Sequence, residues 1–161
     1  MAKKLKKISL VKKSFYNYIV NVFQEGTSYT IGTGKDDLKI HEQYPVIPKG
    51  FGTPAIAFDI DRVALRVEYD LGQSAYYEYD LSVDIYARNN LEREYLLEVM
   101  SEDLEQNTVP LYDYNSASND LLGSLQLTSF DGGPIRIPTP TEEEKFKFNI
   151  TFTFKTVLDY E

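Results

Sequence analysis

The stretch that decides the fold is AYYEYDLSVDIYARNNLEREYLLEVM, residues 75–100. As far as Ala87 its apolar and polar side chains alternate, as they do in a β-strand with one buried face. At Asn89 the period changes, because Asn89 followed by Glu92 has the form of a capping box, with asparagine in place of serine or threonine. Apolar residues then recur at helical spacing as far as Met100. The stretch therefore predicts a strand that passes almost directly into a helix.

The residues before this strand predict the other arm of a long hairpin. Apolar side chains alternate up to Ile60 and resume, with their phase shifted by one, at Val63. A shift of phase inside a continuous strand requires an extra residue. We therefore expect a bulge near Asp61 and Arg62, or two strands that meet at a bend, and a hairpin loop at residues 70–74.

The remaining segments complete a two-layer domain. Apolar spacing predicts an amphipathic helix between residues 6 and 24, and the alternating run FKFNITFTFKTV near the end predicts a central or core-covering strand. Helices and strands in this order predict an α+β fold of one domain, residues 1–161, with an antiparallel or mixed sheet and both helices packed on one face. Further strands are expected at 27–31, 108–114 and 121–128, a basic tip at 1–7, and long loops at 43–54 and 129–145, the second of them an extended loop or arm.

Charge is distributed unevenly along the chain. The net charge is −8, but six of the 17 cationic residues stand in the first 13 positions, so residues 14–161 hold 11 basic and 25 acidic side chains, a net charge of −14. Such a body should repel nucleic acid, since phosphate binding relies on clustered Lys and Arg. The chain has no cysteine, which excludes disulfides and thiolate chemistry.

The start of the chain, MAKKLKKISLVKKSF, is basic but lacks an apolar core of signal-peptide length, so we expect no export signal. No apolar run reaches the ~20 residues of a membrane helix. A basic amphipathic start could lie on an acidic membrane. A solvated helix end is the simpler interpretation, and we expect no membrane partner.

Glu78, Asp80 and Asp84 form an acidic row on one face of the predicted strand. Neighbours in such a row lie roughly 6.5 to 7 Å apart, too far to share a metal ion or a proton. Arg62 and Arg66 share the polar face of the other arm. Depending on the loop register they fall opposite Ser82 and Glu78, or opposite Asp84 and Asp80. Cross-strand ion pairs are therefore the simpler account of the row.

The segment FDIDRVAL, residues 58–65, suggests an alternative with enzyme activity. Its Asp-x-Asp resembles the first motif of haloacid-dehalogenase-type phosphatases, in which Asp59 would accept the phosphoryl group and Asp61 would act as general acid, with magnesium between them. That family needs its strand to end at the motif, whereas here the alternation continues to Tyr69. A later acidic pair that could complete the site is not recognisable.

Three other motifs have simpler interpretations. IGTGKDD lacks the first glycine and the Ser or Thr of a phosphate-binding Walker loop, so we expect a turn. His41 is the only histidine and has no partner at a metal-ligand or acid–base spacing. RIPTPTEEE, residues 136–144, is either a solvated loop or an extended arm that docks on a neighbour. We therefore predict no catalytic, cofactor-binding or metal-binding residue, and no enzyme activity.

The order of elements resembles the tail-terminator, or tail-completion, proteins of long-tailed bacteriophages. The arm-to-helix passage DLSVDIYARNNLEREYLLEVM and the closing strand FKFNITFTF carry most of the resemblance, which extends over residues 5–157 at the level of pattern. The loops after Ser129 and around Gly50 are longer than a minimal member requires.

The resemblance implies a structural virion protein, made in the host cytoplasm, that forms a homo-oligomeric ring, usually a hexamer. Such a ring caps the tail tube in the neck and joins it to the head connector. DNA would pass through without specific binding, because an acidic lumen repels it. Within the same class, another neck or head-completion protein or a tube-like subunit is the alternative. From other classes the alternatives are the phosphatase-like enzyme and a monomeric binding module with a basic membrane-facing helix.

Overall fold

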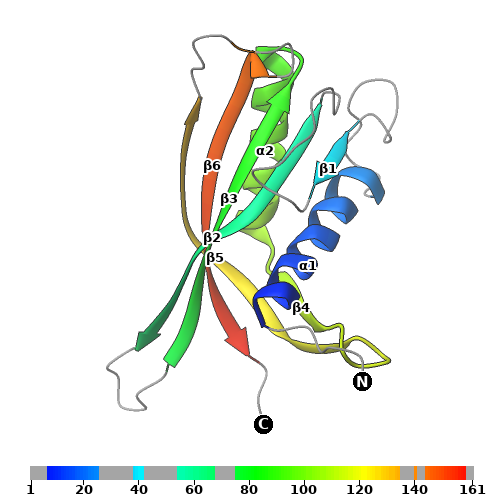
Figure 1. Cartoon of the computed structure of the whole chain (residues 1–161), viewed down its shortest axis with the longest axis vertical. Coiled ribbons are helices and arrows are strands. Elements are labelled where there is room, and N and C mark those ends of the chain that lie inside the picture. The colour runs from blue at the N-terminus through cyan, green and yellow to red at the C-terminus, as the bar shows by residue number, and fades with distance from the viewer. Residues whose placement is uncertain are drawn as a thin grey trace.

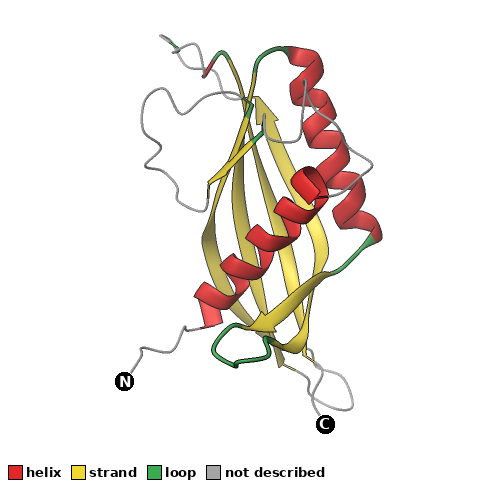
Figure 2. Cartoon of the chain, turned by 90° about the vertical axis from the view of Figure 1, so that its right-hand side faces the viewer, coloured by secondary structure: helices red, strands yellow, loops and turns green. Residues whose placement is uncertain are grey.

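The computed structural model describes residues 7–25, 38–41, 54–67, 75–134, 140 and 144–158. Within these residues the chain forms a six-stranded sheet with two α-helices against one face (Figures 1 and 2). The predicted α+β fold, with both helices on one side of the sheet, is thus confirmed. The helices are α1 (Lys7–Val20), which continues as a π-helical turn η1 (Asn21–Glu25), and α2 (Asn90–Gln106). The strands are β1 (Lys39–His41), β2 (Ala55–Val67), β3 (Ala75–Ala87), β4 (Val109–Asp113), β5 (Asp120–Pro134) and β6 (Phe146–Leu158).

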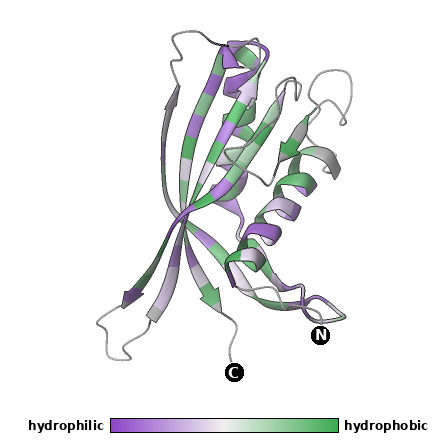
Figure 3. Cartoon of the chain, viewed as in Figure 1, coloured by the Kyte–Doolittle hydropathy of each residue, from purple (hydrophilic) through white to green (hydrophobic). Residues whose placement is uncertain are grey.

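The sheet is mixed and its closing strand is central. The strand order is β1-β2-β3-β6-β5-β4, in which only the β1–β2 pair is parallel. β6 lies between β3 and β5, as its strict apolar alternation predicted. Figure 3 shows this alternation as successive purple and green bands along β3 and β6. One face of the sheet is therefore buried under the helices. The other, here called the outer face, is polar over the middle of β2, β3 and β6 and carries a small buried cluster at one end, Ala55, Ala57 and Tyr86.

The sheet bends along one line, which we call the crease. Asp61 is an extra residue in β2, between the pairs Ile60–Leu81 and Arg62–Asp80, so the predicted bulge is confirmed. β5 has an extra residue as well, Thr128, between the pairs Leu127–Phe154 and Ser129–Thr153. The two bulges lie at the same level of the sheet, because Asp80 of β3 pairs with Thr153 of β6. Bulges increase the local twist. The sheet is accordingly twisted, so that its strands overlap near the middle in the view of Figure 1.

The switch from strand to helix has the predicted cap. The Asn89 side chain accepts a hydrogen bond of 2.8 Å from the Glu92 backbone N–H, and Asn89 itself is extended. The Glu92 carboxylate reaches back one residue further than in the standard capping box and accepts from the Arg88 backbone N–H at 3.0 Å. Such a cap contributes about 1 kcal/mol to helix stability. It fixes α2 immediately after β3.

Aromatic packing holds α1 against the sheet. Phe15 is fully buried and meets Phe58 of β2 edge to face at 4.8 Å and Phe154 of β6 at 5.8 Å between ring centroids. Burial of such a side chain stabilises the fold by about 1.5 to 3 kcal/mol. α2 buries Leu96 and Met100 against the same core. The two helices therefore share one hydrophobic core with the sheet.

The predicted hairpin register is wrong in both of its versions. Arg62 lies opposite Asp80, and Arg66 lies opposite Tyr76. The strand pairing ends at Val67 and Ala75, which shifts the register by two residues from the first prediction. A shift of two keeps every side chain on its face, so the hydrophobic pattern could not reveal the error.

The predicted arm at residues 129–145 is also wrong in its first part. β5 continues through Pro134, because after the bulge its backbone still pairs with β6. β1 was not predicted at all, since three residues are too few to show a period. The strand expected at 27–31, the turn at 31–37 and the hairpin loop at 70–74 lie outside the described residues, as do most of the loops at 43–54 and 136–144.

Candidate functional site

The outer face of the sheet collects the polar residues that the sequence singled out. Arg62 is central to it, because its Nε donates to Asp80 Oδ2 at 2.7 Å and its NH2 group donates to Glu78 Oε1 at 3.0 Å. The Arg66 guanidinium lies 3.4 Å from the same Glu78 oxygen. Hydrogen bonds and charge from Asp80 and Glu78 raise the pKa of Arg62 further above its ordinary value. The two acids thus belong to cross-strand ion pairs, as predicted.

Asp84 differs from the rest of the acidic row because it is buried. It is 1% exposed, and its Oδ1 accepts a hydrogen bond of 2.7 Å from the Asn149 amide. The Lys147 ammonium lies 3.4 Å from Oδ2, an ion-pair distance without hydrogen-bond geometry. Burial alone would lower the pKa of Lys147, but a hydrogen bond with Tyr86 and the Asp84 charge raise it above its usual value. The Lys147 ammonium is therefore charged at neutral pH.

The acids of the row are held by partners on both neighbouring strands. Glu78, Asp80 and Asp84 each have partners on neighbouring strands, and Asp80 also accepts from the Thr153 hydroxyl at 2.8 Å. Among the described residues no three carboxylate or histidine side chains are grouped closely enough to hold a metal ion. The arrangement is that of a cross-linked sheet surface.

Asp59 and Asp61, the residues of the phosphatase-like motif, lie within a continuous strand. Asp59 accepts from the Ile60 backbone N–H at 2.8 Å and pairs with Lys12 of α1 at 2.9 Å. Asp61 is the exposed bulge residue, and β2 continues beyond it to Val67. The loop that such a phosphatase needs directly after its first aspartate is not formed at this place.

The other singled-out motifs give little further geometry. His41 ends β1, the short edge strand. IGTGKDD and most of RIPTPTEEE lie outside the described residues. No helix in the described part of the chain is both long and apolar enough to cross a membrane.

The end of the hairpin carries an apolar surface that the sequence did not reveal. Val63, Leu65 and Tyr77 point to the helix side of the sheet, where equivalent positions nearer the middle are buried, yet Leu65 is 59% exposed. Lys7, the first residue of α1, lies over Tyr77, 3.9 Å from its ring centroid. The helix therefore begins at this level and leaves most of Leu65 uncovered. We call Val63, Leu65 and Tyr77 the hairpin patch. Its three side chains are 37 to 59% exposed.

Comparison with models of protein families gives no match to the chain, and comparison with curated proteins gives none either.

Proposed function

We propose that the chain is a non-enzymatic structural protein of the tail or neck of a long-tailed bacteriophage, a ring-forming tail terminator. The observation that carries the proposal is the hairpin patch, because apolar side chains left uncovered on the core side of a sheet favour burial against another protein. Together with the order of elements, which resembles that family, the patch favours assembly as the role of the chain.

The charge of the surface is consistent with a passage for DNA. The acids of the outer face are largely neutralised by Arg62, Arg66 and Lys147. α2, in contrast, carries six acidic residues and one arginine. In the described part of the chain, Glu94, Glu98 and Glu102 have no ion-pair partner. A ring of such subunits is a poor ligand for DNA, which suits a channel through which DNA slides.

The proposal includes the partners and the location. The subunit is made in the host cytoplasm and enters the virion, where a ring, taken as a hexamer, contacts the tail tube on one side and the head connector on the other. Isologous pairing of the patch would give closed dimers, whereas contact of the patch with a different surface of the next subunit gives a ring when the rotation between subunits closes.

The test is the mass of the purified protein in solution, by native mass spectrometry, with negative-stain microscopy of the same sample. We expect closed rings in the wild-type protein. Leu65→Lys should lower the ring fraction at least tenfold while leaving the melting temperature unchanged, because Leu65 is mostly exposed and contributes little to the core.

Leu91→Lys is the matched control, since Leu91 is 78% exposed and lies on α2, away from the patch. It should assemble as the wild type does. A wild-type protein that stays monomeric at high concentration would overturn the proposal.

A further inference from the structure

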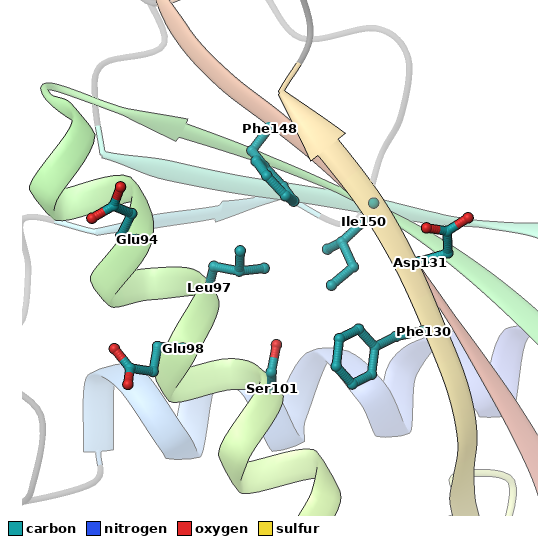
Figure 4. A pocket seen from close by; sticks show the side chains of 9 residues that line it. Glu94, Leu97, Glu98, Ser101, Phe130, Asp131, Phe148 and Ile150 are labelled. Atoms are coloured by element: carbon teal, nitrogen blue, oxygen red, sulfur yellow. The ribbon is translucent and has the colours of Figure 1, made fainter.

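A groove lies on the helix side of the sheet, between α2 and the C-terminal half of β5, on the side of α2 away from α1. It encloses about 430 Å³, and its floor is apolar. Leu97 of α2, Phe130 of β5, and Phe148 and Ile150 of β6 point toward one another across it (Figure 4). Phe130 is 43% exposed, although it faces the helix side of the sheet. The floor therefore has room for an additional apolar side chain.

The rim of the groove is acidic. Glu94 and Glu98, one helical turn apart, flank it on the α2 side, whereas the Asp131 side chain lies on the far side of β5 from the floor (Figure 4). A second hollow continues the groove along β5 as far as Glu105. Arg93, next to Glu94 on α2, lies over the floor residue Phe148, 5.9 Å from its ring centroid. The rim thus favours a partner that carries several positive charges.

The backbone beside the groove is open to pairing. β4 pairs with β5 only over residues 120–125, so residues 126–134 of β5 have β6 on one side and no strand of the described part of the chain on the other. An edge of this kind presents unpaired N–H and C=O groups to an extended segment.

We propose that this groove binds the basic N-terminal segment, residues 1–6, of a second copy of the chain. The segment MAKKLK offers Leu5 for the apolar floor and Lys3, Lys4 and Lys6 for the rim. It is the part of the sequence with the strongest positive charge, and α2 is among the most acidic parts. The inference rests on the self-assembly proposed above and names a contact that joins neighbouring subunits.

The positions of the two sites favour a second copy over the same chain. Lys7 lies against Tyr77, whereas the groove lies beside Phe148 and Ile150, which pair with Ile85 and Val83. Along β3 the level of Phe130 lies four residues from Tyr77 and the level of Phe148 lies eight residues from it, roughly 13 to 27 Å along the strand, and the groove is displaced sideways by a further strand. Six residues span at most about 20 Å when fully extended. The segment of the same chain is therefore too short to reach the far end of its own groove, beside Phe148.

The experiment reverses the charges on each side separately. The groove variant combines Glu94→Lys with Glu98→Lys, and the tip variant combines Lys3→Glu, Lys4→Glu and Lys6→Glu. Each alone should weaken self-association at least tenfold by sedimentation velocity, with an unchanged melting temperature. Glu102→Lys is the matched control, because Glu102 is exposed on the same helix but does not line the groove, and it should associate as the wild type does.

Mixing the two variants distinguishes contact between copies from contact within one chain. In an equimolar mixture each tip meets a groove of opposite charge on the other variant, so association should return. If association returns only when both sets of changes are in one chain, the contact is intramolecular and the inference is wrong.

A peptide assay separates this inference from the proposed function. A fluorescent MAKKLKK peptide should bind the protein that lacks residues 2–6, and the groove variant should weaken that binding at least tenfold. If the chain lacking residues 2–6 forms the same rings as the wild type and does not bind the peptide, the tip contact is overturned and the proposed ring assembly is not. A monomeric wild-type protein would overturn both.

Discussion

At the scale of single residues, the acids of β3 have different energetic roles although they look alike in sequence. Glu78 and Asp80 face exposed arginines, where ion pairs contribute little. Asp84 and Lys147 are mostly excluded from water, where an unpaired charge is costly. The buried pair is therefore the sensitive point of the outer face.

Asp84→Asn should destabilise the protein by about 2 to 4 kcal/mol, because it leaves the Lys147 ammonium buried beside an amide instead of a carboxylate. Arg66→Met, which removes an exposed partner of Glu78, should change stability by no more than about 0.5 kcal/mol. Urea denaturation at pH 7 measures both. Equal losses in the two variants would contradict the distinction.

Tyr79 should make stability depend on alkaline pH. Burial, with a smaller contribution from Tyr77, raises the pKa of Tyr79 to about 12. Below pH 10, its ordinary value, the hydroxyl is protonated in both states and has no effect. Between pH 10 and 12 the unfolded chain loses this proton while the folded chain keeps it, so stability falls as pH rises, by up to about 2 kcal/mol.

Thermal melts at pH 8 and pH 11 measure this dependence. Tyr79→Phe should lose less stability between the two pH values than the wild type, and Tyr112→Phe, at an exposed position, should lose as much as the wild type. An identical alkaline loss in Tyr79→Phe would show that Tyr79 is not the group responsible.

At the scale of elements, the sequence predicted the elements whose apolar side chains recur regularly and missed those without such a pattern. The bulge at Asp61 was predictable because ordered apolar alternation on both sides of it changes phase. The continuation of β5 through Gly132, Gly133 and Pro134 was not, because these residues have no side-chain pattern and usually mark loops. The hairpin register could not be predicted, because registers that differ by two residues place every side chain on the same face.

Gly132 is required by the close approach of β5 to β6. A Cβ at this position would lie 2.4 Å from the Asn149 carbonyl oxygen and 2.8 Å from Ile150 Cα. Because these are backbone atoms, Gly132→Ala should cost roughly 1 to 3 kcal/mol. Gly133→Ala meets nothing within 4 Å and should be neutral or slightly stabilising.

Urea denaturation of the two glycine variants is the measurement, and each serves as the control of the other. If both substitutions were equally tolerated, β5 would not run against β6 as closely as described.

At the scale of the whole molecule, charge and shape were predictable to different extents. Net charge and its concentration in the first 13 residues follow directly from the sequence. The hairpin patch and the groove do not, because both depend on where the helices end over the sheet. A position such as Leu65 looks like any core residue until the cover above it is known.

The acidic body should prevent DNA binding in spite of the basic tip. The protein at micromolar concentration should not retard a linear duplex in a gel at 50 mM salt, and removal of residues 2–6 should not change this. Retardation that weakens steeply with added salt would show phosphate contacts and contradict the expectation.

The crease also bears on how the chain can change its length in evolution. Loss of one residue from a strand normally turns every following side chain to the opposite face. Asp61 and Thr128 are already surplus to the pairing, so the residues that follow each of them would keep their faces without it. Homologous chains one residue shorter are therefore expected to have their gaps at these two positions, where a deletion removes the bulge and leaves every core side chain on its buried face.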